Sequence, residues 1–313
     1  MNTAIPTSGT QYELAFGDYR AVIASVGSSL RVLQHNGRDL VVPFEADQMH
    51  VQYRGVTLAP WPNRIAGGKY SFEGTEYQVP LTEPERGNAL HGLAAWLDFQ
   101  AIEKSESHVL LAAEIVPQFG YPHRLLLRVR WELTAAGLET TVTASNTGTS
   151  AAPYGTGPHP YLVAGEGRVD DWVLELPAAE VMTVTEDRLV PTGVVDVVSH
   201  ADGAFDFRVA RGIGDVFIDH AFTSIIPNDA GRALVRVTTA DGSGVEMEWG
   251  DGLPWVQVHT ADQPNPDNHR LGLAVEPMTC PPDAFNSGVD LIVLQPGESS
   301  SVSWIIRAVN PGQ

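Results

Sequence analysis

The sequence of 313 residues contains a single cysteine, Cys280. One thiol cannot form an internal disulfide, which argues against the small secreted domains that disulfides hold together. The first residues, MNTAIPTSGTQYELAFG, lack the basic and apolar regions of a secretory signal. No apolar run approaches the roughly 18 residues that a membrane-spanning helix needs. We therefore expect a cytoplasmic location and no membrane partner.

Positive charge is scarce. The chain has 19 lysines and arginines against 38 aspartates and glutamates, which gives a formal net charge of −19. Such a protein repels nucleic acid and anionic membrane surfaces, so neither is an expected partner. Because 43% of the residues are hydrophobic and the charges are interspersed, the composition predicts a globular protein with a sizeable core.

Helical periodicity with caps is almost absent as well. Short alternating or β-branched segments flank turn-forming sequences instead, which predicts hairpins. The predicted turns lie at residues 35–38, 73–75, 134–137 and 241–244. Antiparallel sheets need two packed layers to bury their apolar faces, so we predict an all-β fold, a large antiparallel β-sandwich. No linker-like tract interrupts the chain, and residues 1–313 are expected to form a single domain.

The sequence lacks a phosphate-binding loop, a nucleophile elbow and a dinucleotide fingerprint. Five polar residues nevertheless stand in unusual settings. They are Arg64 after a proline-rich turn, His91 before a glycine, His159 between two prolines, Asp219 in an apolar segment and Glu276 at the end of an apolar strand. Each also has an ordinary structural interpretation, such as a surface arginine, a core histidine or an outward-facing strand acid.

The sequence around His159 and Glu276 carries the stronger physical signals. Pro160 keeps the residue before it extended, so the imidazole of His159 is predicted to have a fixed direction. Burial of a carboxylate at the end of an apolar strand would raise the pKa of Glu276, as in a general base. His91 and His159 do not have a metal-ligand spacing such as HExxH, which disfavours zinc.

Six segments of the chain, in order, resemble the aldose 1-epimerases, also called galactose mutarotases. They read APWPNRIAGGKYSFEGTEYQVP, NALHG, GYPHRLLLRVRWELTAAGLETTVTASNTG, GPHPYL, IDHAF and VEPMTCPPDAFN. The wording APWPNRIA and GPHPYL is most similar to a bacterial branch of that family. The resemblance implies a galactose mutarotase-like supersandwich with an open sugar-binding cleft, no metal and no cofactor.

The resemblance also implies roles for individual residues. Glu276 would take the proton from the anomeric hydroxyl of a hexose, and His159 would protonate the ring oxygen, so that the ring opens and recloses as the other anomer. The expected sugar-binding residues are Asn63, Arg64, His91, Asp219 and His259, the last at a position where many family members have a tyrosine. Because the ordinary pKa values of glutamate and histidine bracket neutral pH, we expect an ionised Glu276 and a partly protonated His159.

Several alternatives remain open from the sequence. The substrate is expected to be a neutral hexose such as galactose or glucose, but a sulfonated or 6-phosphorylated hexose is an alternative, and a basic cleft would be its sign. Arginines available for such a cleft are Arg54, Arg86 and Arg124. A noncatalytic sugar-binding protein and a metal-dependent isomerase are further alternatives. His91 and His159 could also exchange roles, and the protein is expected to be a monomer or homodimer.

Four other side chains, one histidine and three tryptophans, have predicted environments. His123, in GYPHRL, is expected on the surface. Trp61, Trp96 and Trp255 are candidates either for stacking on a sugar or for the core.

Overall fold

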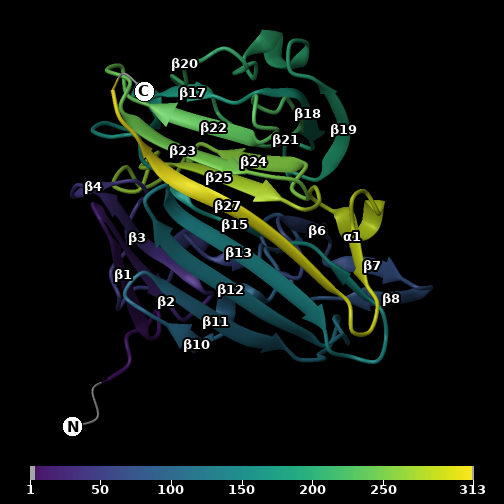
Figure 1. The fold of residues 1–313 in the computed structure, drawn as a ribbon. Helices are drawn as coiled ribbons and strands as arrows, with labels where there is room; N and C mark the ends of the chain where they lie inside the picture. The colour runs from purple at the N-terminus through teal and green to yellow at the C-terminus, as the bar shows by residue number, and fades with distance from the viewer. Residues whose placement is uncertain (1–3, 312–313) are drawn as a thin grey trace.

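A computed structural model describes residues 4–311 and consists mainly of antiparallel strands (Figure 1). Nine strands form the largest sheet. In their order across the sheet they are β10 (Gln100–Lys104), β11 (His108–Ile115), β12 (Leu125–Thr134), β13 (Gly137–Asn146), β27 (Ser299–Val309), β23 (Gly244–Trp249), β22 (Ala233–Thr238), β17 (Val173–Glu175) and β20 (Arg211–Gly212). β27, near the C-terminus, therefore pairs with a strand of the first half of the chain and one of the second half.

A second sheet of six strands carries most of the site. In order across the sheet they are β16 (Tyr161–Leu162), β25 (Leu273–Met278), β24 (Trp255–His259), β21 (Asp219–Ile225), β18 (Ala178–Val184) and β19 (Pro191–Asp196). β25 is buried at every position, because it is an interior strand with covered faces. One hydrophobic cluster joins residues of both sheets, such as Val245 and Met247 with Val256 and Val275, so the two sheets share a core.

The remaining strands are short or peripheral. A four-stranded sheet holds β1 (Gln11–Phe16), β2 (Tyr19–Ala24), β3 (Ser29–His35) and β4 (Arg38–Asp39). Two-stranded pairs are β5 (Thr57–Leu58) with β15 (Gly157–Pro158), β6 (Arg64–Ala66) with β9 (Asn88–Leu90), β7 (Lys69–Phe72) with β8 (Thr75–Gln78), and β14 (Ala152–Tyr154) with β26 (Ile292–Leu294). Figure 1 shows the β7–β8 hairpin beside the helix α1, away from the four-stranded sheet.

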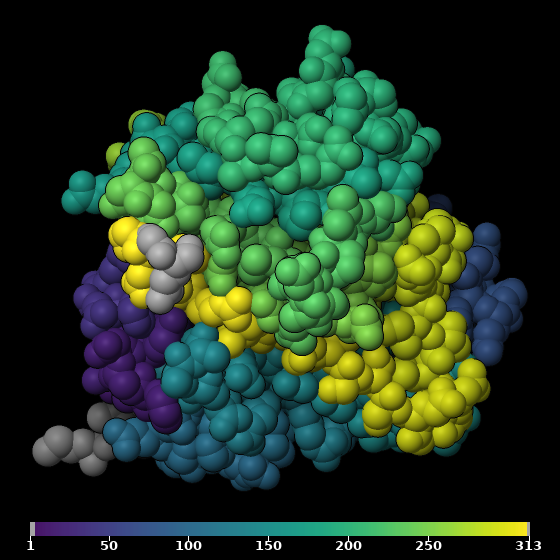
Figure 2. Space-filling view, turned by 45° about the horizontal axis from the view of Figure 1, so that its top comes forward, coloured from purple at the N-terminus to yellow at the C-terminus, as the bar shows by residue number. Residues whose placement is uncertain are grey.

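Helix is as scarce as predicted. Among residues 4–311 the structure has one short α-helix, α1 (Ala284–Ser287), and four 3₁₀ segments, Val51–Tyr53, Ala94–Trp96, Val169–Asp171 and His200–Gly203. No helix in this part of the chain is long and apolar enough to cross a membrane. In the space-filling view the yellow C-terminal segment runs between the blue and purple N-terminal part and the green segments around residue 200 (Figure 2).

The predicted hairpins and the all-β sandwich are confirmed. The four predicted turns connect β3 to β4, β7 to β8, β12 to β13 and β22 to β23. In β12, buried residues alternate with more exposed ones over ten positions, which is the pattern of a strand with one face on the core. Turn residues and alternation are local signals, so the sequence contains them without reference to the rest of the fold.

The prediction of a surface position for His123 is wrong. Its residue surface is only 5% exposed, and its ring lies 4.9 Å from the ring of Tyr121 and 5.6 Å from that of Phe72, centroid to centroid. The β7–β8 hairpin folds over the start of β12 and covers the imidazole, a long-range contact that the local sequence does not reveal.

The three tryptophans divide between the two interpretations. Trp61 and Trp255 are buried, and the indole N–H of Trp255 donates to Asp290, so both belong to the interior. Trp96 is half exposed and packs against His50 and Tyr53.

Candidate active site

One open cavity of about 290 Å³ contains all the residues that the sequence singled out as catalytic or sugar-binding. Its lining includes Asn63, Arg64, His91, His159, Asp219, His259 and Glu276. These residues come from segments more than 200 positions apart in the chain. The fold therefore assembles the predicted set in one place, in a hollow of the size that small-molecule sites have.

One wall of this cavity is the face of the six-stranded sheet, and we call Asp219, Gln257, His259 and Glu276 the sheet wall. In the antiparallel register Asp219 lies opposite His259 across β21 and β24, and Gln257 lies opposite Glu276 across β24 and β25. Residues opposite each other, and residues two apart on one strand, point to the same face of a sheet. The register alone brings these four side chains together. Glu276 lies within β25, which continues to Met278, and not at the strand end predicted from the sequence.

The facing wall is made of short strands and turns, and we call Asn63, Arg64, His91 and His159 the loop wall. His159 lies between β15 and β16, where its N–H donates to the carbonyl of Val56 (3.1 Å) and its carbonyl accepts from the N–H of Gly55 (2.8 Å). Its ring is stacked with the rings of Tyr161, at 5.1 Å, and Tyr53, at 6.5 Å, centroid to centroid. The imidazole is thus held through two backbone hydrogen bonds and by two stacked aromatic rings.

Gly157 brings the His159 segment against the sheet wall. A β-carbon at this position would lie 2.6 Å from the carbonyl oxygen of Pro277, the residue after Glu276. A contact that short is impossible without movement of one backbone. The glycine therefore permits the close approach of β15 to β25 that places His159 beside Glu276.

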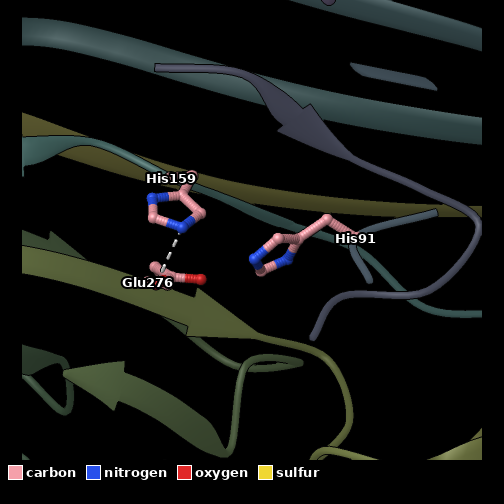
Figure 3. A group of neighbouring side chains, drawn as sticks. All are labelled: His91, His159 and Glu276. Carbon is pink, nitrogen blue, oxygen red and sulfur yellow. Dashed lines mark ion pairs between the residues drawn. The ribbon is translucent and has the colours of Figure 1, made fainter. Parts of the chain in front are cut away.

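Asn63 and His91 form a reciprocal pair on the loop wall. Both have left-handed backbone conformations, with φ of 56° and 62°. The N–H of His91 donates to the carbonyl of Asn63 (2.8 Å), and the N–H of Asn63 donates to Nδ1 of His91 (3.2 Å). Because Nδ1 is an acceptor, the hydrogen of the neutral imidazole is on Nε2, which points toward His159 and Glu276 in Figure 3. Such conformations are rare outside glycine and cluster at functional sites.

Arg64, the first residue of β6, is held by carboxylates on two sides. Its Nε and one terminal nitrogen donate to the two oxygens of Glu83, at 2.9 and 3.0 Å. The same terminal nitrogen lies 3.6 Å from Oδ2 of Asp219. The opposite charges of these two carboxylates raise the pKa of Arg64 despite its burial, so the guanidinium stays charged.

Glu276 and His159 form a histidine–carboxylate pair in the cavity. Nε2 of His159 lies 3.4 Å from Oε1 of Glu276, and both side chains are almost fully buried (Figure 3). Burial raises the pKa of Glu276 well above its ordinary value, helped by the nearby charge of Asp219 and opposed by Arg64. Burial and the neighbouring His259 lower the pKa of His159 to about 3. In the free site, burial therefore works against both of the charged forms expected from the sequence, the Glu276 carboxylate and the His159 imidazolium.

The pair nevertheless has the number of protons that the expected chemistry needs. A protonated Glu276 beside a neutral His159 has the same number of protons as a carboxylate beside an imidazolium. A proton that moved between Oε1 and Nε2, which lie 3.4 Å apart, would interconvert the two forms without exchange with solvent. Such a pair titrates as a unit, and its two forms share one macroscopic protonation state.

His91, His159 and Glu276 also offer three potential metal-ligand atoms within 4.8 Å of one another. Tetrahedral zinc with bonds of about 2.1 Å would hold its ligands about 3.4 Å apart, as the His159 and Glu276 atoms are. The hydrogen bond from Asn63 to Nδ1 of His91, however, leaves Nε2 protonated and without a lone pair for a metal. The donor set fits hydrogen bonding to a sugar better than it fits a metal ion.

Sequence reasoning missed several residues of the cavity, among them Tyr53, Glu83, Tyr161 and Gln257. Gln257 donates to Asp219 (2.7 Å) while its own Oε1 is buried and makes no hydrogen bond to a described residue. Its spacing of two from His259 in WVQVH was an available signal, because both must share a sheet face. Glu83 lies in the polar segment TEPERG, where nothing local distinguishes it from a solvated acid.

The lining of the cavity is not basic. Within the part of the chain that the structure describes it contains the arginines Arg64 and Arg86 and the acids Glu83, Asp219, Asp262 and Glu276. The other two arginines considered from the sequence are not among the lining residues: Arg124 pairs with Glu114, and the guanidinium of Arg54 lies over the ring of Tyr161, 5.7 Å from its centroid. The expected sign of an anionic sugar is therefore missing from the described lining.

Comparison with known proteins identifies the family. A model of the aldose 1-epimerase family matches residues 10–307. The chain belongs to the aldose 1-epimerase family. Its relatives in the family include YihR of Escherichia coli K12, an uncharacterized protein that is 39% identical over 298 residues, covering 95% of this chain and 92% of YihR. The galactose mutarotase of Rattus norvegicus is 28% identical over 236 residues, covering 67% of this chain and 64% of the rat protein.

Solved structures support the fold of this family member. A putative aldose 1-epimerase from Escherichia coli K12 superimposes with a TM-score of 0.81 at 22% identity, covering 96% of this chain and 98% of the other. An aldose epimerase homologue from C. elegans gives a TM-score of 0.84 at 19% identity, covering 96% and 99%. The predicted galactose mutarotase-like sandwich is confirmed by this likeness.

Proposed function

We propose that this protein is an aldose 1-epimerase that interconverts the α and β anomers of a neutral hexopyranose such as galactose or glucose. The observation that carries the proposal is the buried Glu276–His159 pair, 3.4 Å apart inside a cavity lined by hydrogen-bonding groups. Mutarotation removes one proton and delivers another on the same molecule, and a pair that shares one proton between two sites supplies both functions.

In the proposed reaction Glu276, as carboxylate, takes the proton from the anomeric hydroxyl. The bond between C1 and the ring oxygen breaks as C1 becomes an aldehyde, and the ring oxygen takes a proton from the His159 imidazolium. The pair is then neutral, the form that burial favours. Rotation about C1–C2 and reclosure on the other face return both protons and give the opposite anomer. Each properly positioned acid or base typically contributes about 10²- to 10⁴-fold.

Arg64, His91 and Asp219 are proposed to bind the sugar. Arg64 and Nε2 of His91 present N–H donors to the cavity, and Asp219 presents a carboxylate that Gln257 orients. Asn63 fixes His91 from behind, and His259 adds an imidazole next to Asp219 on the sheet wall. Donors on one wall and acceptors on the other suit a ligand with hydroxyl groups on both sides.

The test is polarimetry on freshly dissolved α-glucose and α-galactose at low buffer concentration. Glu276→Gln keeps the size of the side chain but cannot take the proton, so we expect kcat to fall by about 10²- to 10⁴-fold. Glu106→Gln, at an exposed position, is the matched control and should keep full activity. Calorimetric titration with the same sugars should show that Glu276→Gln still binds them.

The outcomes separate the alternatives. Acceleration by the wild type that Glu276→Gln abolishes supports the proposal. Acceleration with 6-phosphorylated or 6-sulfonated hexoses alone would replace the neutral substrate by an anionic one. Binding of a sugar without acceleration of its mutarotation would contradict the enzyme and leave a noncatalytic sugar-binding protein. Activity that a chelator removes would favour the metal-dependent alternative.

A further inference from the structure

We infer that Glu83 is a positioning residue that fixes the guanidinium of Arg64 against the sugar and balances its charge next to the Glu276–His159 pair. The inference rests on the proposed function, because it concerns how that same site is held. It is carried by a set of contacts around this carboxylate, which lines the cavity but belongs to neither the sheet wall nor the loop wall.

Glu83 binds Arg64 through both of its oxygens, at 2.9 and 3.0 Å from Nε and one terminal nitrogen. Parallel hydrogen bonds of this kind fix the plane of a guanidinium as well as its distance. The other terminal nitrogen, Nη1, takes no part in them and lies 3.5 Å from the side-chain oxygen of Asn63. Two of the three nitrogens are thus committed to Glu83, which determines where the third points.

Glu83 is itself held from several directions. Its oxygens also accept from the side chain of Asn88 (3.1 Å) and lie 3.4 Å from Nε of Arg86. Its backbone exchanges hydrogen bonds with that of Asn88, N–H to carbonyl in both directions. Since Asn88 begins β9, which pairs with β6, the carboxylate is fixed to the same small sheet that carries Arg64. A catalytic group needs such a supporting layer to keep its geometry.

Charge balance gives Glu83 a second effect. The positive charge of Arg64 lowers the pKa of Glu276, and Glu83 partly cancels that charge. The other ionisable groups around Glu276 are His91, His159, Tyr161, Asp219 and His259. Without the negative charge of Glu83, more of the positive charge of Arg64 acts on the Glu276–His159 pair. This favours loss of the proton that the pair holds. The alkaline limb of the kcat/KM profile should then move to lower pH.

The first variant is Glu83→Gln, measured by polarimetry with a sugar that the wild type turns over. An error of about 1 Å in a positioned group costs on the order of 10²-fold, so we expect kcat/KM to fall by about 10- to 100-fold. Glu85→Gln is the matched control. It removes the same charge from the same loop at an exposed position, and should keep the wild-type rate and pH profile.

A double-mutant comparison separates positioning from a general effect on folding. If Glu83 acts through Arg64, Glu83→Gln should cost less than about 3-fold in a protein that already carries Arg64→Lys. An equal loss in both backgrounds, or an unchanged pH profile in Glu83→Gln, would overturn the inference. Glu83→Asp keeps the charge but shortens the side chain. Its pH profile should therefore be close to that of the wild type, while its kcat/KM should remain lower.

A readout without catalysis distinguishes this inference from the proposed function. In ¹⁵N spectra, the Nε–H of Arg64, assigned by its loss in Arg64→Lys, should exchange slowly with water in the wild type and rapidly in Glu83→Gln. If the wild type accelerates no sugar but shows this difference, the proposed function fails and the positioning holds. If Glu83→Gln leaves the exchange of this N–H unchanged, the positioning fails whatever the activity.

Discussion

The sheet wall and the loop wall of the cavity both carry ionisable and hydrogen-bonding side chains, but different physical interactions hold these side chains in position. On the sheet wall the antiparallel register puts Asp219 opposite His259 and Gln257 opposite Glu276, so each side chain inherits its position from a ladder of hydrogen bonds. On the loop wall His91 and His159 depend on isolated backbone hydrogen bonds, left-handed residues and glycines. Each side chain of the sheet wall is held in place by many hydrogen bonds of the ladder, so the loss of one has little effect. Each side chain of the loop wall depends on one or two contacts. Backbone changes should therefore harm the loop wall more than side-chain changes harm the sheet wall.

Gly157→Ala is the strongest test of this comparison. The new β-carbon would meet the carbonyl oxygen of Pro277 at 2.6 Å, so the two backbones must separate and His159 must move away from Glu276. We expect kcat/KM to fall by about 10²-fold, the cost of a displacement of about 1 Å. The measurement is polarimetry together with circular dichroism, to verify that the variant folds.

The control for that experiment is Gly212→Ala in β20. A β-carbon there meets nothing within 4 Å, so rate and stability should be unchanged. If a folded Gly157→Ala protein kept the wild-type rate, the loop wall would tolerate displacement and the comparison would be broken.

Gln257→Leu tests the other side of the comparison with a smaller expected effect. The substitution removes the hydrogen bond from Gln257 to Asp219 (2.7 Å), but the register and Arg64 still hold that carboxylate. The loss of this hydrogen bond leaves the Asp219 carboxylate less firmly oriented toward the sugar. We expect KM to rise by about 10-fold with little change in kcat, because one hydrogen bond to a charged group contributes about 1.5–3 kcal/mol at most. A loss as large as that of Gly157→Ala would contradict a sheet wall held by many hydrogen bonds.

The same contrast explains how much the sequence could predict. Hairpins such as β7–β8 and β22–β23 follow from turn residues and alternation, which are local. His159 and Glu276 were found because they stand in short motifs that resemble a family. Glu83 was missed, because its meaning depends on an arginine 19 residues away that only the fold brings close. The raised pKa of Glu276 was anticipated from its apolar strand, but the lowered pKa of His159 was missed, because it depends on burial and not on residue type.

His123, a buried histidine outside the cavity, can be compared with His159. Its substitution is expected to have the smallest effect of the changes considered. It is buried like His159, but it faces the rings of Tyr121 and Phe72 and has no well-formed hydrogen bond to a described residue. Burial lowers its pKa, so between the folded pKa and the ordinary value of about 6.5 the unfolded chain binds more protons than the folded protein. The stability linked to this group is therefore complete above about pH 6.5 and is lost as the pH falls below it.

His123→Phe removes this dependence without removing a well-formed hydrogen bond. At pH 8 the free energy of unfolding should change by no more than about 1 kcal/mol, because an aromatic ring replaces an unpaired polar one of similar shape. Between pH 8 and pH 5.5 the variant should lose less stability than the wild type, while His108→Gln, at a more exposed position, should follow the wild type. Chemical denaturation at both pH values makes the measurement. If all three proteins lost the same free energy of unfolding between pH 8 and pH 5.5, burial of His123 would not lower its pKa. The argument that burial disfavours the charged form of His159 would then be weakened as well.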